Sequence, residues 1–325
     1  MNLASTDLSL SPQLISIVGP TATGKTKLAL QLTKVLANDY QGFDLISADS
    51  RQVYQGLEII SGADLPAGFK LAQEKSFSFP FYQAEKVNIH GISIISAQAE
   101  WSVTHFQQLA LAVITSSLKN NRLPIVVGGT GLYHQHLFNQ DPKLYIKPNA
   151  KLRAKLSKLS VTDLQKQLDQ SDPTKLMQMN NSDRNNPTRL IRAIEIAFFG
   201  PSEIVKQSKV PSLKQLTIGL TDSLVNIESK IKLRVQERMT QGALEEVNHL
   251  LSLKRINKQV LTTTGVQQLK AFINHEINQE KLVKLWTLCE FQYAKRQLTW
   301  WKKRANVIWF AADKVQIEQI SKRLN

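Results

Sequence analysis

A short apolar segment that runs directly into a glycine-bounded loop constrains the fold of this chain more than any other feature. The segment is Leu14–Val18, and the loop reads Gly19-Pro20-Thr21-Ala22-Thr23-Gly24-Lys25-Thr26. Two glycines with four residues between them, followed by Lys and a hydroxyl residue, are typical of a phosphate-binding loop between a strand and a helix. Lys25–Leu36 then carries apolar residues at helical spacing, so the sequence predicts strand, loop and helix in that order.

Each part of this loop has a role in anion binding. Its glycines let the backbone curl, so that several N–H groups and the N-terminus of the helix point at one anion. Lys25 adds a positive charge, and the Thr26 hydroxyl is placed to hold Mg²⁺. A purely structural glycine turn is the alternative, but it does not explain why Lys25, Thr26 and the strand-to-helix context occur together. The loop predicts a bound phosphate without identifying the compound.

The chain after the loop alternates between predicted strands and helices. Phe43–Ser47 is a second buried strand, and Phe106–Leu118 is an amphipathic helix that leads through Pro124 into a third strand, Ile125–Val127. Between them, Glu58–Ala99 is less regular and is expected to form a flap or a pair of short strands. This alternation predicts an α/β fold of the P-loop NTPase-like class, in which helices flank a parallel sheet.

Residues 139–208 differ from the rest in being polar, rich in Lys and Gln and without a strand pattern. Helices are expected to start at Asp163, Asp172 and Asn186-Pro187, so this segment is predicted to be an inserted all-helical module. Residues 13–138 and 209–325 then form the core with its C-terminal helices, and residues 1–12 form a flexible tail. The core is completed by strands at Leu216–Leu220 and Val307–Ala311 and by a long helix at Gln279–Arg304.

Charge and cysteine content limit the possible partners and compartments. The formal net charge is +15, from 41 Lys and Arg against 26 Asp and Glu, which suits a polyanion such as nucleic acid but also a basic enzyme without one. Cys289 is the single cysteine, which excludes an intrachain disulfide framework. The sequence has neither the pattern of a targeting peptide nor an apolar stretch of membrane-spanning length, so we expect a cytoplasmic protein.

Two further predicted strand ends carry polar residues. Asp49 follows the second strand at the carboxyl edge of the sheet, close to the loop, where it can bind Mg²⁺, accept a proton or merely cap the next turn. Gly128-Gly129-Thr130-Gly131 follows the third strand and opens a helix. The Thr130 hydroxyl is placed to bond a diphosphate oxygen, and a tight strand-to-helix turn is the equally acceptable alternative.

Together these segments resemble the tRNA dimethylallyltransferase family, over a range from about Leu14 to Ala311. The resemblance rests on Gly19–Thr26, Asp49–Tyr54, Trp101-Ser102 with Phe106, Leu123–Tyr133, Asn186–Ala193 and Tyr293–Trp300. It implies transfer of a dimethylallyl group from dimethylallyl diphosphate to N6 of an adenine in tRNA, by analogy adenosine 37 beside the anticodon. Mg²⁺ is the implied cofactor, the tRNA anticodon arm is the implied macromolecular partner, and we expect a monomer that does not bind membranes.

The resemblance also implies roles for particular residues. Asp49 would be the general base, Thr130 would contact the diphosphate, and Lys25 would assist catalysis, while Gly19, Pro20, Thr21, Ala22, Thr23, Gly24, Lys25 and Thr26 would bind the diphosphate and Thr26 would hold Mg²⁺. The residues expected to bind tRNA are Asp49, Ser50, Arg51, Gln52, Arg189, Arg192, Lys295, Arg296, Gln297 and Trp300. Without the resemblance, residues 295–302 equally fit an amphipathic helix with buried aromatics and a solvated basic face.

The chain departs from the family pattern at several places. No lysine occurs in Ile60–Pro66, no basic residue stands near Ser223, Val266 replaces a common tyrosine, and Glu290-Phe291 stand where Thr-Arg is usual. We therefore expect a divergent enzyme. The alternatives are a P-loop small-molecule or nucleotide kinase, an adenylate isopentenyltransferase that acts on free nucleotides, and a non-catalytic RNA-binding relative.

Overall fold

The computed structural model describes residues 12–63, 65–139, 141–200 and 213–321. Packing divides the chain into two compact units, Met1–Leu137 with Pro211–Asn325, and Phe138–Val210. The predicted flexible tail lies outside the described residues except for Pro12. The boundaries predicted for the insertion, 139 and 208, stay a proposal, which the separate packing of Phe138–Val210 supports.

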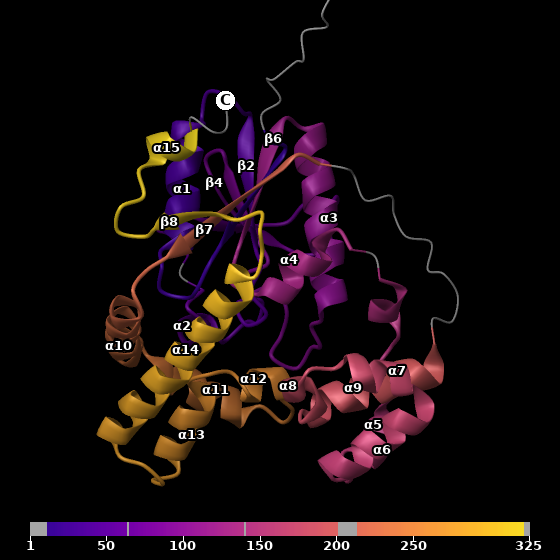
Figure 1. The fold of residues 1–325 in the computed structure, drawn as a ribbon. Helices are drawn as coiled ribbons and strands as arrows, with labels where there is room; N and C mark the ends of the chain where they lie inside the picture. The colour runs from indigo at the N-terminus through magenta and orange to yellow at the C-terminus, as the bar shows by residue number, and fades with distance from the viewer. Residues whose placement is uncertain (1–11, 64, 140, 201–212, 322–325) are drawn as a thin grey trace, which may run out of the picture. The chain divides into compact units, whose positions relative to one another are not determined.

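An eight-stranded sheet forms the centre of the larger unit, in the spatial order β3-β4-β5-β2-β6-β1-β7-β8 (Figure 1). All neighbours from β5 to β8 pair in parallel, whereas β3 and β4 extend one edge in antiparallel pairing. This arrangement confirms the predicted α/β class. The strands are β1 (Leu14–Val18), β2 (Gly42–Ser47), β3 (Lys70–Ala72), β4 (Phe81–Ala84), β5 (Val87–His90), β6 (Arg122–Val127), β7 (Gln215–Thr221) and β8 (Ile308–Ala311).

Helices cover both faces of this sheet. In Figure 1, α1 (Lys25–Val35) lies on one side and α3 (Val103–Lys119) on the other. Right-handed crossovers require this, because β1-α1-β2 and β5-α3-β6 cross the sheet in opposite directions. No helix of the described residues is long and apolar enough to cross a membrane. The remaining helices of this unit are α2 (Glu58–Ser61), α4 (Gly131–Leu137), α10 (Leu224–Thr240), α11 (Ala243–Ser252), α12 (Lys258–Leu261), α13 (Val266–Ile273), α14 (Gln279–Lys302) and α15 (Ile317–Ser321).

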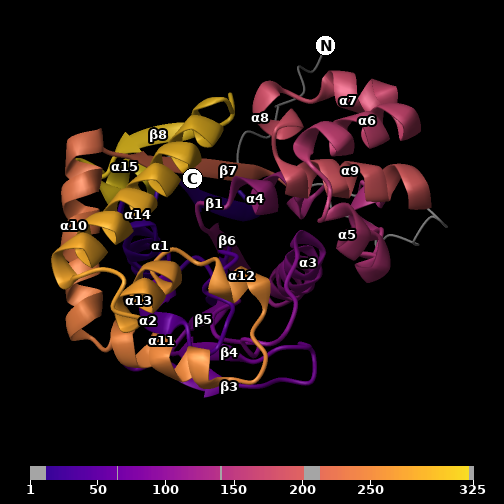
Figure 2. The same cartoon turned by 90° about the horizontal axis from the view of Figure 1, so that it is seen from below.

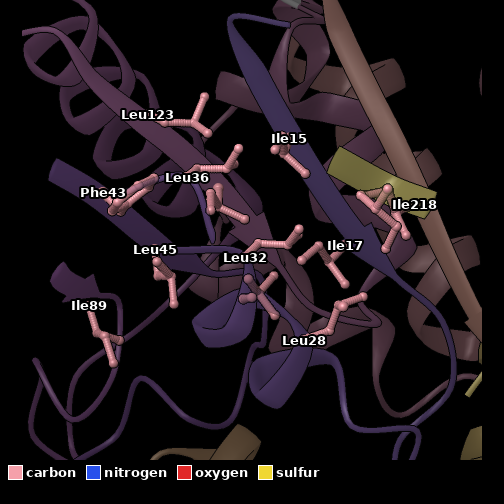
Figure 3. Close-up of a cluster of buried hydrophobic side chains, with 14 of the residues drawn as sticks. Ile15, Ile17, Leu28, Leu32, Leu36, Phe43, Leu45, Ile89, Leu123 and Ile218 are labelled. Atoms are coloured by element: carbon pink, nitrogen blue, oxygen red, sulfur yellow. The ribbon is translucent and has the colours of Figure 1, made fainter. Parts of the chain in front are cut away.

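Apolar side chains fix the helix after the phosphate loop against the sheet (Figure 3). Ile15 and Ile17 are two residues apart and so point to the same face of β1, while Leu28 and Leu32 are four apart and share one face of α1. These four side chains are fully or almost fully buried together with Phe43 of β2. Burying each one stabilises the fold by about 1.5–3 kcal/mol, which holds the start of α1 at the end of β1.

The segment between β2 and α3 is more regular than predicted. It contains the short α2 and three strands, and β5 pairs in parallel with β2 as part of the main sheet. The expectation of a flap or of only two strands was therefore wrong. The reason is length, since strands of three or four residues, such as β3 and β5, are too short to show a clear alternating pattern.

The third predicted strand begins three residues earlier than expected and includes Pro124. Proline is rare inside a sheet because it has no N–H to donate. Here β6 pairs with β2 from Arg122 onward but with β1 only from Ile125 onward. At Pro124, β6 is therefore paired with only one neighbouring strand, β2, which is the situation of a strand at the edge of a sheet.

The smaller unit is helical, as predicted, and contains α5 (Ala150–Leu156), α6 (Val161–Ser171), α7 (Pro173–Gln178), α8 (Asn181–Arg184) and α9 (Pro187–Phe199) after a short 3₁₀ helix, Pro142–Tyr145. Asp172 and Asn186 cap α7 and α9, so two of the predicted helix starts are confirmed. The third was wrong, because Ser160 caps α6 and Asp163 stands three residues inside, where it bonds the Ser160 hydroxyl at 2.6 Å. Leu164 and Leu190 are among the fully buried residues of its core.

A buried carboxylate joins three strands of the sheet away from the phosphate loop. Asp44 of β2 accepts hydrogen bonds from Arg122 at 2.7 Å, from Ser117 at 2.9 Å and from Asn88 at 2.8 Å, and it contacts His90 at 3.2 Å. Burial disfavours the ionised form of Asp44, but the hydrogen bonds from His90 and Arg122 outweigh burial and lower the pKa to about 2. The ionised carboxylate is thus part of the folded structure.

Asp44→Asn is expected to lower the free energy of unfolding by about 3 kcal/mol, because it leaves the Arg122 charge without its buried partner. The folded-state pKa of Asp44 lies below the unfolded value, so its contribution is complete above about pH 4 and disappears as the pH falls toward 2. Urea unfolding across this window measures both effects. The exposed Asp39→Asn serves as the control, and an unfolding free energy of Asp44→Asn equal to that of the control would contradict the prediction.

Candidate active site

The phosphate loop is curved by glycines and closed by its own backbone. Gly19 has φ 133° and Gly24 has φ 79°, both in the region that favours glycine. A side chain at Gly19 would collide with the carbonyl oxygen of Leu220 in β7. The Thr23 hydroxyl donates to the carbonyl of Pro20 at 2.8 Å, inside the turn. The loop is therefore preformed between β1 and α1, as the sequence predicts.

Lys25 lies across the loop and is surrounded by other charges. Its Nζ donates to the carbonyl of Pro20 at 2.7 Å. Burial and the nearby guanidinium of Arg234 lower its pKa to about 8, although the carboxylate of Asp49 opposes this. Lys25 and Arg234 thus form a positive pair that an anion in the loop would stabilise.

Asp49 stands at the carboxyl end of β2 and faces the same cleft as the loop. One carboxylate oxygen accepts the backbone N–H of Arg51 at 2.8 Å, so Asp49 does cap the following turn. The carboxylate is also close enough to act on the pKa of Lys25 and of Tyr293. Capping uses one oxygen, which leaves the other available for chemistry in the cleft.

The residues after Asp49 connect parts of the cleft that are distant in sequence. Arg51 donates through Nη1 to the carbonyl of Gln259. Gln52 donates to the carbonyl of Gly62 at 2.8 Å and accepts from the Ser47 hydroxyl at 2.7 Å. Gln52 thus connects the loop around Gly62 to the end of β2.

The glycines after β6 allow the end of β2 and helix α14 to pack closely against this turn. A side chain on Gly128 would collide with Ala48, one on Gly129 with Gln297, and one on Gly131 with the ring of Trp300. Gly128, Gly129 and Gly131 therefore have a packing role. This agrees with the tight strand-to-helix turn that the sequence offered as the alternative to a ligand contact.

Two polar side chains of α14 reach the loop and the strand ends. Gln297, only 6% exposed, accepts the backbone N–H of Thr21 at 2.8 Å. Burial and the charge of Asp49 raise the pKa of Tyr293 to about 12. Gln297 thus holds the phosphate loop from α14, and Tyr293 of the same helix lines the cleft near Asp49.

Basic side chains lie over aromatic rings along α14 and directly after it. The guanidinium of the exposed Arg296 lies 5.7 Å from the ring centre of Tyr293. Nζ of Lys295 lies 4.8 Å from the ring centre of Phe291, and the guanidinium carbon of Arg304 lies 4.3 Å from the ring centre of Trp300. Of these six residues, Tyr293 and Arg296 line the cleft.

One cleft of about 1120 Å³ brings most of the predicted site together. Its lining includes Thr21, Ala22, Gly24, Lys25, Thr26, Asp49, Ser50, Arg51, Gln52, Arg296 and Gln297. Within the described structure, the predicted residues of this unit outside that lining are Gly19, Pro20, Thr23, Thr130, Lys295 and Trp300. The structure therefore brings the loop, Asp49 and α14 together at one cleft, whose lining does not include Thr130.

Three basic residues of α10 also line the cleft and were not predicted as site residues. Lys230, Arg234 and Arg238 are spaced by four, so they share one face of the helix. Arg234 donates to the Thr21 hydroxyl at 3.0 Å, and Lys230 pairs with Asp222 at 2.6 Å. The spacing was the available signal. These residues bring positive charge to the cleft, although the basic residue that the family usually has near Ser223 is missing.

The two arginines predicted to bind tRNA in the helical unit differ in their surroundings. Arg189 is exposed and pairs with Asp183. Arg192 donates to the fully buried Glu195 at 2.6 Å and to the carbonyl of Lys143 at 2.9 Å. Arg192 therefore has a structural role in this unit, and Arg189 is the more accessible of the two.

Comparison with known proteins places these features in a family. The family model described as IPP transferase matches residues 52–304, and one described as isopentenyl transferase matches residues 12–75. The tRNA dimethylallyltransferase of a Nostoc species is 33% identical over 307 residues, covering 93% of this chain and 94% of that protein. That of Anoxybacillus flavithermus is 31% identical over 305 residues, covering 93% and 91%.

Solved structures agree with the sequence comparison. The tRNA isopentenylpyrophosphate transferase of Bacillus halodurans is 30% identical, with a TM-score of 0.64 and coverage of 96% of both chains. A eukaryotic dimethylallyltransferase acting on tRNA has a TM-score of 0.70 at 23% identity, covering 95% of this chain and 76% of that one, which is a likeness in fold. On the family model and the identities over nine-tenths of its length, the chain belongs to the tRNA dimethylallyltransferase (IPP transferase) family.

Proposed function

We propose that this protein transfers the dimethylallyl group of dimethylallyl diphosphate to N6 of an adenine in tRNA, by analogy adenosine 37 beside the anticodon. The observation that carries the proposal is the cleft in which the phosphate loop, the carboxylate of Asp49 and the basic helix α14 meet. The cleft thus offers an anion site and a base in one place. Family membership identifies the reaction that such a site would perform.

At the donor end, the reaction needs charge opposite the departing diphosphate. Lys25 and Arg234 provide cations, and the N–H groups of Gly19–Thr26 provide hydrogen bonds. The Thr26 hydroxyl lines the same cleft and is an oxygen ligand that suits Mg²⁺. A bound Mg²⁺ would add positive charge at the diphosphate oxygens.

At the acceptor end, the N6 amine attacks the first carbon of the prenyl group. The new C–N bond forms as the C–O bond to the diphosphate breaks, and the diphosphate leaves with the bonding electrons. Asp49 accepts the proton that the amine loses. The adenine must leave its stack to reach Asp49, as in other enzymes that modify bases.

The tRNA would lie over the exposed basic side chains. Arg296 stands at the cleft on α14, and Arg189 is exposed on the helical insertion, which we propose contacts the anticodon arm. The net charge of +15 favours such contacts with phosphates. Because a single chain supplies every residue named for the cleft, we propose that the monomer is active.

Arg296→Ala is expected to weaken tRNA binding several-fold and to reduce the slope of log affinity against log salt by about one, since one phosphate contact is lost. The Michaelis constant for dimethylallyl diphosphate should change little. Filter binding at several salt concentrations measures the effect. The control is Lys119→Ala, which also removes one exposed charge but lies just before the start of β6, at the end of the strands opposite the cleft. Weaker donor binding with intact tRNA binding would instead place Arg296 in the donor site.

The transfer itself can be tested on the product. Incubation of the protein with Mg²⁺, dimethylallyl diphosphate and unmodified tRNA should give tRNA whose nucleoside digest contains prenylated adenosine. A digest that contains only unmodified adenosine would contradict the proposed function.

A further inference from the structure

A buried ion pair at the cleft joins α10 to α14, two helices that lie side by side (Figure 2). Arg238 donates through Nη1 to Oε1 of Glu290, and the two residues are only 5% and 7% exposed. The same Oε1 accepts the indole N–H of Trp286 at 2.8 Å. Trp286 is fully buried and packs against Gly265. Glu290 is thereby fixed in place, and it in turn fixes the guanidinium of Arg238.

Arg238 and Glu290 both line the cleft that contains the phosphate loop. Arg234 stands one helical turn before Arg238, about 6 Å along α10, and bonds the Thr21 hydroxyl of that loop. A side chain on Gly62 would collide with Nη2 of both arginines. The two guanidinium groups therefore lie side by side along one wall of the cleft, next to Gly62.

Stability alone does not explain this pair. Desolvating two charges costs about as much as their attraction returns, so replacing a buried ion pair by apolar residues is often neutral or stabilising. A guanidinium also has five N–H donors in a fixed fork, of which Glu290 occupies Nη1. Because Glu290 fixes the guanidinium, the directions of its remaining N–H donors are fixed as well. A group that recognises phosphate oxygens requires such fixed donors.

We propose that Arg238, held by Glu290, binds the diphosphate of the allylic donor together with Lys25 and Arg234. Phe291, next to Glu290 in sequence, carries no charge, whereas Lys230, Arg234 and Arg238 of α10 line the cleft. This inference rests on the proposed function for the identity of the donor. Recognition of a diphosphate by the pair can nevertheless be measured without any transfer.

The experiment compares three variants by calorimetric titration with inorganic diphosphate and by steady-state kinetics. Arg238→Gln with Glu290→Gln removes both charges at once, so no unpaired charge is left buried. Its dissociation constant for diphosphate and its Michaelis constant for dimethylallyl diphosphate should both rise about tenfold, as expected for the loss of one charged hydrogen bond. Arg238→Lys keeps the charge against Glu290 but not the fork, and about a threefold rise is expected.

The control is Lys232→Gln, which removes one exposed charge from the same helix and should change neither constant. Urea unfolding establishes that each variant is folded. Unchanged diphosphate affinity in both Arg238 variants would overturn the inference, and so would a loss of tRNA affinity with intact diphosphate binding. If the unaltered protein binds diphosphate through Arg238 but does not prenylate tRNA, the inference stands and the proposed function fails.

Discussion

Asp49→Asn is expected to lower the rate of prenyl transfer to tRNA about a thousandfold, within the range by which general bases accelerate reactions. Asparagine keeps the oxygen that accepts the N–H of Arg51, so the turn after β2 should persist. It cannot accept the proton of the N6 amine. Single-turnover kinetics with saturating tRNA measure the loss, and the affinity for tRNA should stay within a few-fold of the original.

Asp49→Ala is the matched comparison, because it removes both the base and the cap of the turn. If Asp49 is the base, the Asn and Ala variants lose activity to a similar extent. If it merely caps the turn, Asn retains the activity and Ala loses it. An equal loss of catalysis and tRNA binding in both variants would contradict the role of base.

Lys25→Met is expected to reduce transfer by about a hundredfold or more, because it removes a cation from the departing diphosphate. It should also change the pH dependence of donor binding. The pKa of Lys25 is lowered to about 8 by burial and by Arg234, so the side chain is charged below pH 8 and increasingly neutral above it. Since diphosphate favours the charged form, the Michaelis constant of the unaltered enzyme for the donor should rise between pH 7 and pH 9.

The Met variant has no titrating group at this position and should show a flat profile over the same window. Kinetics from pH 6.5 to 9.5 in buffers of constant ionic strength compare the two, with the exposed Lys119→Met as the control. A rise of the same size in Lys25→Met would assign the pH dependence to another group and contradict this account of the loop.

The parts of the site that could be predicted are those whose signals are local. The strand, loop and helix from Leu14 to Val35 follow from adjacent residues, and Asp49 follows from the rule that ligands bind at the carboxyl ends of parallel strands. In space β2, β6 and β1 are neighbours. For this reason three separate strand ends converge on one site.

The parts that could not be predicted depend on contacts between distant segments. Gln297 was expected to face tRNA, but it is buried against the loop 276 residues earlier in the sequence. Its surroundings depend on how α14 packs on Gly129 and Gly131, which no local pattern encodes. Arg238 likewise needs Glu290 of another helix to acquire its orientation.

The most direct test of the account is the choice of acceptor. The protein, with Mg²⁺ and dimethylallyl diphosphate labelled in the prenyl group, is given unmodified tRNA or free AMP in parallel reactions. A mixture of ATP and candidate metabolites tests phosphoryl transfer. The account predicts that label enters tRNA at an adenine, with AMP and the metabolites unmodified. Label in AMP alone, or turnover of ATP without prenylated tRNA, would contradict it.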